Sequence, residues 1–315
     1  MKISEKQRQF RRVQAFRSGV RRVLAIAFVL FCVGLSLNDA FHWVPGWTWH
    51  DVFVRCGIHE TPSSDWPCTV RAMNVGAGDC FLIQCEGQFV VIDTGTEPSA
   101  ERVAADLIRL GAQEPNYLFL SHYHDDHTGG ISALCKHLRP KTIVAGVRTA
   151  EQQSEEYRRV HAVAQAAQIP IQYASAGDSY AAGPLQIEVL ADGSLLDSEN
   201  DRSLVLRVTY QHISMLFTGD METLAEQALL QSGVDVSADW LKIAHHGSKT
   251  STSEEFLSAV SPRFAAISCG RSNPPDEAVL RRLHTYPVPY VRTDLHGETL
   301  FATDGTNCAT FTENS

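Results

Sequence analysis

From about residue 69 onward, the chain alternates short apolar runs with amphipathic segments. Short apolar runs bounded by Gly, Asn or Asp predict strands, whereas apolar residues spaced three and four apart predict helices. The predicted strands are 69–76, 81–95 with a turn at Glu86–Gly87, 116–122, 142–146, 185–190, 203–210, 213–220, 238–247 and 263–270. The predicted helices are 99–112, 127–138, 149–168, 221–233 and 253–260, and the chain closes with periodic segments at 278–284, 289–294 and 299–305.

The order of these elements bears on the fold class. Strands come first as a meander and then mix with helices, and the same order repeats further along the chain. This order favours two mixed β-sheets packed face to face with helices outside, an αββα sandwich of the α/β class. Periodicity alone indicates only one large α/β domain, predicted to span 69–315, and the finer assignment depends on the motifs described below.

The amino-terminal segment has the pattern of a targeting signal. Residues 1–22 are rich in arginine, and an uncharged apolar run follows at 23–37. A spanning helix needs about 20 residues, so the span is predicted to extend through 23–40 toward a tryptophan-rich stretch. No Ala-x-Ala cleavage site follows. We predict an uncleaved signal anchor with residues 1–22 in the cytoplasm and the body outside a cytoplasmic membrane, crossed once. A cleaved signal peptide is the alternative interpretation.

The cysteines fit an exported body. Of the eight cysteines, one lies in the predicted anchor. Cys56 and Cys68 flank a Pro/Ser-rich part of the predicted linker 41–68, and we predict a disulfide between them. Cys80 and Cys85 are five apart in a predicted strand, so their side chains point to opposite faces and should not pair with each other. The chain has no Cys-x-x-Cys pair, which argues against a thiolate zinc site.

The charge distribution limits the kind of partner. The net charge of the chain is −9, and residues 1–49 carry eight Lys/Arg against two acids, which leaves −15 for the remainder. An acidic body argues against a broad electrostatic surface for nucleic acid. It does not exclude a narrow site in which metal cations supply the positive charge.

The densest candidate chemistry lies in the stretch "SHYHDDHTGG", which follows the predicted strand 116–122. His122 and His124 are two residues apart and can converge on one cation from a curved loop, while Asp126 and His127 can turn to a second cation. Imidazole and carboxylate are suitable ligands for Zn²⁺, and also for Mn²⁺ or Fe. Two cations about 3.5–4 Å apart can hold a phosphate and lower the pKa of a bridging water.

Two later stretches complete this set. "LFTGD" ends an apolar strand with Asp220, a suitable bridging carboxylate, and "LKIAHHGSKTSTS" ends another strand with His245 and His246. Each stretch alone is a weak signal, because a turn or a surface histidine pair has the same appearance. Their order after the His/Asp run makes the combination specific.

These motifs resemble the metallo-β-lactamase fold superfamily. The segments "MNVGAGDCFLIQ", "VVIDTG", "SHYHDDHTGG", "NDRSLVL", "LFTGD", "LKIAHHGSKTSTSEEFLSAVSPRFAAISCG" and "YVRTDLHG" resemble, more narrowly, the extracytoplasmic metallo-β-lactamase domain of ComEC DNA-uptake proteins. The resemblance runs from about Arg71 to Gly305 and implies a nuclease that acts on one DNA strand during import. With one predicted span, the chain is expected to be a stand-alone relative of that domain without the DNA pore.

The resemblance also implies a ligand set for two divalent ions, with zinc expected first and manganese second. His122 and His124 would bind the first ion, Asp126 and His127 the second, and Asp220 would bridge them. One of His245 and His246 supplies the last histidine, and the sequence leaves open which. Asp126 or Asp220 would orient the attacking water.

Further residues are implicated by position. Many superfamily members have another histidine before the Gly-Asp strand; here Asn200 or Asp201 must substitute, or one ion is held less tightly. Asp79 and Asp93 match acidic positions of the family. The run Ser248, Lys249, Thr250 and Ser251 forms a hydroxyl-rich, singly basic loop suited to phosphate oxygens, with Lys249 as a catalytic candidate. The same run also suits a helix N-cap.

One segment departs from the family. Members usually have Asn-x-Tyr-Gly-His-Pro after the "ISCG" strand, whereas "RSNPPDEAVL" keeps Asn273 and Pro275 but lacks the tyrosine, glycine and histidine. This departure puts the substrate in doubt more than the fold.

The expected function is therefore a membrane-attached, metal-dependent phosphodiesterase, with DNA or another phosphodiester as substrate. The same site in another enzyme class hydrolyses carbonyl compounds, as in lactamases, lactonases and thioesterases. A non-catalytic docking subunit of an envelope DNA-uptake system is the third interpretation, motivated by the altered "NPPDEA" segment and the acidic body.

Overall fold

A computed structural model describes residues 5–41, 65–149, 153–194 and 196–314. The chain divides into two compact units, Met1–Thr61 and Pro62–Ser315, which are described separately. In the first unit, α1 (Glu5–Phe41) is one continuous helix, so it contains most of the predicted basic segment as well as the apolar run. The linker 42–64, and with it Cys56 of the predicted disulfide, lies outside the described residues.

Within α1, the stretch Gly19–Leu37 is long and apolar enough to cross a membrane, with a mean hydropathy of 2.1. Most of its large apolar side chains are exposed in this structure, among them Leu24, Phe28 and Leu30, whereas Leu35 is buried. A membrane anchor and a signal sequence both have these properties, so the unit is one amino-terminal apolar helix of either kind.

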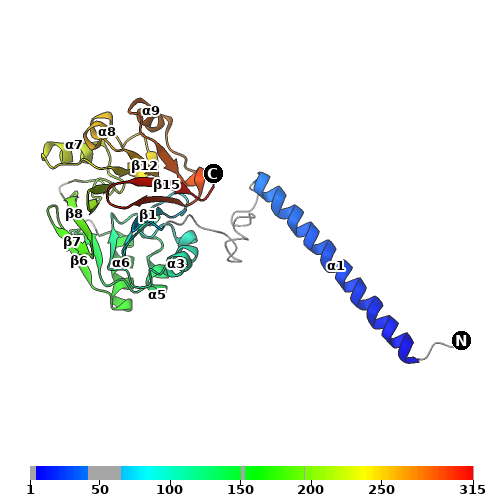
Figure 1. Ribbon diagram of the computed structural model, residues 1–315. Helices are drawn as coiled ribbons and strands as arrows, with labels where there is room; N and C mark the ends of the chain where they lie inside the picture. Colours follow the sequence, from blue (N-terminus) through cyan, green and yellow to red (C-terminus); the bar gives the residue numbers. More distant parts are fainter. Residues whose placement is uncertain (1–4, 42–64, 150–152, 195, 315) are drawn as a thin grey trace. The chain divides into compact units, whose positions relative to one another are not determined.

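The second unit is built on two mixed β-sheets (Figure 1). The eight-stranded sheet has the order β15-β14-β1-β2-β3-β4-β5-β6. Its strands are β1 (Cys68–Ala72), β2 (Phe81–Cys85), β3 (Gln88–Ile92), β4 (Tyr117–Leu120), β5 (Ile143–Gly146), β6 (Ile171–Ala174), β14 (Thr299–Thr303) and β15 (Cys308–Thr312). Strands β3 to β6 are parallel, and the others pair antiparallel.

The seven-stranded sheet has the order β13-β12-β11-β10-β9-β8-β7. Strands β10 to β13 are parallel, and β7 to β10 are antiparallel. The strands are β7 (Ser179–Ala182), β8 (Leu185–Ala191), β9 (Val205–Tyr210), β10 (Ile213–Phe217), β11 (Trp240–Lys242), β12 (Phe264–Ile267) and β13 (Tyr290–Arg292).

Helices cover the outer face of each sheet (Figure 1). The first sheet is covered by α3 (Ala100–Arg109), α5 (Ile131–His137) and α6 (Glu155–Ala167), and the second by α7 (Thr223–Gln231), α8 (Glu254–Val260) and α9 (Glu277–Thr285). The short elements are η1 (Glu97–Ser99), α4 (Asp125–Thr128), η3 (Ala244–Gly247) and α10 (Thr293–His296). Because both faces of each sheet are buried, the central strands are continuously apolar.

Three apolar clusters hold these four layers together. Phe81, Leu206 and Trp240 belong to the cluster between the sheets, and the other two clusters lie under the outer helices. The predicted αββα sandwich is confirmed. Cys80 and Cys85 lie in different clusters, so they face opposite sides of the first sheet as predicted.

Candidate metal centre

The predicted site residues gather at one edge of the sandwich, where parallel strands of both sheets end. Asp93 follows β3 and Ser121 follows β4, and these two strands pair in parallel in the first sheet. Asp220 follows β10, while His246 follows β11 within η3. The carboxyl ends of parallel strands meet at a common edge, as in other α/β sites.

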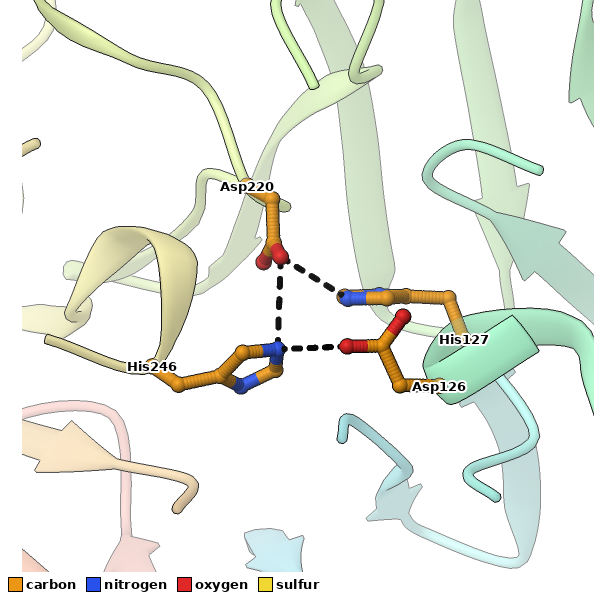
Figure 2. A group of neighbouring side chains, drawn as sticks. All are labelled: Asp126, His127, Asp220 and His246. Atoms are coloured by element: carbon orange, nitrogen blue, oxygen red, sulfur yellow. Dashed lines mark hydrogen bonds and ion pairs between the residues drawn. The ribbon is translucent and has the colours of Figure 1, made fainter. Parts of the chain in front are cut away.

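Four side chains from these loops point toward one another (Figure 2). His127 Nε2 lies 3.2 Å from Asp220 Oδ2, and His246 Nε2 lies 3.2 Å from both Asp220 Oδ2 and Asp126 Oδ2. His127, Asp220 and His246 are buried, whereas the Asp126 side chain is 36% exposed. The group therefore opens to solvent at Asp126.

Both imidazoles of this group are oriented through their other ring nitrogen. His127 Nδ1 lies 2.8 Å from Asp93 Oδ2, and His246 Nδ1 donates to the Ser268 carbonyl oxygen over 2.9 Å. Each Nε2 atom is thereby directed into the group, and the buried Nε2 of His127 has no hydrogen-bond partner there. Metal-binding histidines usually have a carboxylate or carbonyl on the other ring nitrogen in this way.

The carboxylates make this site strongly attractive to cations. Burial lowers the pKa of His127, but Asp220 and Asp93 outweigh burial and raise it to about 10. Burial likewise opposes protonation of His246, whose pKa is nevertheless raised well above its usual value by Asp220 and Asp126. Burial favours the neutral form of Asp220, yet His127 and His246 hold the pKa of that carboxyl well below its usual range.

The donor set fits a divalent transition metal. Two imidazole nitrogens and two carboxylates supply borderline and hard ligands in one buried group, a combination suited to zinc, manganese or iron. A second group of Asp79, Asp93 and His127 adjoins it and shares His127. A buried Asp79 oxygen, Oδ1, also lacks a hydrogen-bond partner.

A buried lysine that the sequence analysis did not single out lies beneath these carboxylates. Lys242 Nζ lies 2.6 Å from Asp79 Oδ2 and 3.2 Å from Asp220 Oδ1, and it donates to the Gly219 carbonyl oxygen over 2.6 Å. Its side chain is 1% exposed. Burial lowers the pKa of Lys242, but the two carboxylates outweigh burial and raise it. The available signal was a lysine between the apolar residues Leu241 and Ile243 of a predicted strand.

His122 and His124 lie beside the four-residue group. His122 Nε2 is 3.0 Å from His124 Nδ1, and the ring centroids of His122 and His127 are 4.1 Å apart. His122 is buried, and burial together with the neighbouring His127 lowers its pKa well below its usual value. His124 is exposed. The structure therefore brings these two histidines together as a pair at the edge of the group.

The two adjacent histidines after β11 have different surroundings. His246 is buried within the group, whereas the His245 side chain is 28% exposed and its Nδ1 lies 3.2 Å from Glu222 Oε1. Both residues have positive φ angles, 48° and 53°. His245 Nε2 is 3.9 Å from Asp220 Oδ2, so His245 lies at the rim.

The hydroxyl-rich loop after these histidines is largely engaged within the protein. Thr250 Oγ1 donates to Glu222 Oε1 over 2.6 Å and contacts Ser248 Oγ at 2.9 Å. Ser251 is buried and donates to the Ala244 carbonyl oxygen. Lys249 is exposed. The loop thus presents one exposed lysine, and the Thr250 hydroxyl is already engaged by Glu222.

The segment expected to replace the missing histidine also contains a buried serine, Ser203. Asp201 Oδ1 accepts from the Glu222 backbone N–H, and Asn200 has a buried, unpartnered side-chain oxygen. Asp201 belongs to neither of the metal-like groups among the described residues. Ser203 Oγ instead accepts from the Asp220 backbone N–H over 2.9 Å. Ser203 was also missed from sequence, because one serine at a strand start carries no distinctive signal.

Close backbone approaches require glycine near the centre. A Cβ atom at Gly130 would collide with the Thr94 carbonyl oxygen, so the helix that follows can pack this closely only with glycine there. Gly247, with a φ angle of 82°, contacts Pro275 so closely that a Cβ atom would overlap it. The altered "NPPDEA" segment therefore packs against the loop that carries His246.

Comparisons with known proteins agree with this fold. The protein-family model described as "Metallo-beta-lactamase superfamily" matches residues 73–271 of this chain. Among solved structures, CmlA, a diiron β-hydroxylase from Streptomyces venezuelae, is similar with a TM-score of 0.50 and 13% identity, covering 80% of this chain and 55% of that chain. At this identity the similarity shows the fold alone.

Two curated relatives are similar to this chain over about three quarters of its length. The chain is 30% identical over 259 residues to ComE operon protein 3 of Bacillus subtilis. The matched region covers 74% of this chain and 33% of that protein. It is 31% identical over 255 residues to Competence protein ComA of Neisseria gonorrhoeae, covering 79% and 34% respectively. The chain therefore spans about a third of the length of these relatives.

Proposed function

The chain belongs to the metallo-β-lactamase superfamily, and from this premise we propose that it is a metal-dependent phosphodiesterase attached to the cytoplasmic membrane. The observation that carries the proposal is the buried convergence of two imidazoles and two carboxylates in Asp126, His127, Asp220 and His246. The resemblance to the DNA-uptake domain and the similarity to Competence protein ComA support DNA as the phosphodiester.

The proposed ligands fall into two sets around Asp220. Asp126, His127 and His246 would hold one divalent ion, with Asp220 shared, and the pair His122 and His124 would contribute to a second. Zinc suits the imidazoles, and manganese suits the carboxylate-rich side. Bound divalent ions would supply a Lewis acid for the phosphoryl group and would lower the pKa of a water molecule.

The residues around these ligands would keep them in position. Asp93 and the Ser268 carbonyl oxygen fix the ring orientations of His127 and His246, which keeps each Nε2 available. Lys242 holds Asp79 and Asp220 in place. Asp126, the partly exposed member of the group, is positioned to orient water at the entrance.

Substrate binding would use the loop that follows His246. Lys249 is exposed on this loop and would make one charge-assisted contact with a phosphate oxygen. Glu222 lies beside this site, and the body carries a net negative charge. Both repel the phosphates of DNA, so we expect long DNA to bind weakly and in a strongly metal-dependent manner. The apolar helix α1 supports attachment to a membrane, with the body on its outer side.

The test is hydrolysis by the metal-loaded full chain. We expect cleavage of bis-p-nitrophenyl phosphate and single-stranded DNA, and none of nitrocefin or a thioester. Asp220→Ala should abolish cleavage, whereas Lys249→Ala should reduce kcat/KM by about 10- to 150-fold, equivalent to about 1.5–3 kcal/mol. Lys136→Ala, which removes an exposed lysine on α5, is the matched control.

The other two interpretations predict different results. Cleavage of nitrocefin or the thioester with both phosphodiesters untouched would establish the carbonyl-hydrolase interpretation in place of ours. Inactivity on every substrate, with metal bound at full occupancy, would favour the docking subunit of an envelope machine.

A further inference from the structure

Two cysteines lie directly opposite each other in the first sheet. Cys68 of β1 and Cys85 of β2 are register partners in an antiparallel pair of strands. Opposite residues in such a ladder alternate between hydrogen-bonded and non-hydrogen-bonded pairs. The next pair along the same register, Pro67 and Glu86, is hydrogen-bonded, because the Glu86 N–H donates to the Pro67 carbonyl oxygen over 3.0 Å. Cys68 and Cys85 are therefore a non-hydrogen-bonded pair.

This class of pair has the spacing that a disulfide needs. The other end of the ladder has the same alternation, since the Met73 N–H donates to the Cys80 carbonyl oxygen over 2.9 Å. Non-hydrogen-bonded partners have Cα atoms about 4.5 Å apart with their side chains close together. Disulfides span Cα separations of about 4.4–6.8 Å. Because these two Cα separations overlap, a disulfide between Cys68 and Cys85 requires no backbone movement.

The two side chains also share one environment. Cys68 and Cys85 are both 0% exposed and both belong to the apolar cluster between the sheets, so they point to the same face. The adjacent Cys85 thiol, together with burial, raises the pKa of Cys68, which agrees with contact between the sulfur atoms. Both are thiols in this structure.

Other described cysteines of the second unit have different neighbours. Cys80 faces the opposite side of the sheet, and Cys269 Sγ contacts Asp294 Oδ1 at 3.2 Å. Among the strand pairings of the described residues, no other two cysteines are register partners.

We propose that Cys68 and Cys85 are joined by a disulfide when the body folds outside the cytoplasm. The two thiols would lose two protons and two electrons as the S–S bond forms. A thiol–disulfide oxidoreductase would accept the electrons through exchange, and its own disulfide would become two thiols. Because both sulfurs are buried, this exchange accompanies the pairing of β1 with β2. The proposal depends on the location of the body and is independent of the proposed hydrolase activity.

The bond would stabilise the fold by restricting the unfolded chain. It closes a loop of about 18 residues, for which the chain-entropy model predicts a rise in Tm of about 5–10 °C in a domain of this size. It also competes with the predicted Cys56–Cys68 link, since Cys68 can join only one partner.

Peptide mapping of the full chain separates these possibilities. The protein is isolated from membranes with thiols blocked by N-ethylmaleimide in denaturant, and is then digested with trypsin without reduction. Cleavage after Arg55, Arg71 and Arg102 places Cys56 and Cys68 in one peptide and Cys80 and Cys85 in the next. We expect the two peptides to be joined, with the loss of two hydrogen atoms. A Cys56–Cys68 bond would instead appear within the first peptide.

Single variants identify the atoms involved. Cys56→Ser and Cys80→Ser should retain the link between the peptides, whereas Cys85→Ser should abolish it. Reduction should lower the Tm of the wild-type chain by about 5–10 °C and should not change that of the Cys68→Ala/Cys85→Ala variant. Blocked thiols at both Cys68 and Cys85 in the native chain, or a Cys56–Cys68 link, would overturn the proposal whatever substrate is cleaved.

Discussion

Replacing Lys242 with methionine tests how the carboxylates of the metal centre are held. Methionine keeps an unbranched side chain but removes the ammonium that binds Asp79, Asp220 and the Gly219 carbonyl oxygen. The site is almost inaccessible to water, because Lys242 is 1% exposed and both aspartates are 2% exposed. Two buried carboxylates would therefore lose the ammonium that contacts both, and His127 and His246 would be the cationic groups left beside them.

The magnitude follows from this burial. Removing one partner of a buried ion pair costs about 3–5 kcal/mol, because the remaining charge is left uncompensated. In a domain of this size, each kcal/mol lowers Tm by about 2–4 °C, so we expect metal-free Lys242→Met to unfold about 6–20 °C below the wild type. A divalent ion would offset part of this loss, so metal should raise the Tm of the variant more than that of the wild type.

The assay is thermal unfolding of the full chain in a chelator and with added Zn²⁺, followed through tryptophan fluorescence. Trp240 is a suitable probe, because it is 2% exposed in the core between the sheets. Lys249→Met is the matched control: the same change at an exposed position should alter stability by less than about 0.5 kcal/mol. If Lys242→Met in chelator unfolds at the wild-type temperature, the ammonium does not hold the carboxylates and the reasoning is refuted.

Four further predictions concern the metal, the pH dependence of stability and the membrane. His122→Ala/His124→Ala should lose most of one metal equivalent in elemental analysis, and full occupancy would remove this pair from the ligand set. Because the pKa of His127 is raised to about 10, metal binding near pH 7.5 should release protons, and titration calorimetry in two buffers that shows no release would contradict the raised pKa. The same shift gives the metal-free protein stability that is complete below about pH 6.5 and is lost as the pH rises toward 10, which thermal unfolding against pH measures. A phosphatase fused after Trp49 should be active only if the body lies outside the cytoplasm, so activity confined to a cytoplasmic reporter would reverse the proposed topology.

Much of the fold was predictable because its central strands are buried on both faces. Runs such as that of β4 are continuously apolar and end at chemically distinctive loops. Strands β6, β7 and β15 were missed, because their side chains are partly exposed and their apolar pattern is correspondingly weak. Edge strands gain less from burial and more from backbone pairing, which leaves little trace in residue type.

The site was predictable where its residues are close in sequence. His122 to His127 lie in one loop, so their concentration is visible without a fold. The contact of Lys242 with Asp79 joins positions on different sheets, and no local pattern records it. The choice between His245 and His246 likewise depends on two positive φ angles in the turn, which place His246 inside and His245 at the rim.

The four-residue group has a mechanical consequence. Asp126 and His127 follow a strand of the first sheet, whereas Asp220 and His246 follow strands of the second. An ion bound by all four would act as a removable cross-link between two half-domains, in addition to their apolar packing and the buried Lys242–Asp79 ion pair. Its stabilisation would grow with the logarithm of free metal concentration. The separation of the two sheets would then be controlled by metal supply, so that chelation would loosen the seam between the halves before it unfolds either sheet.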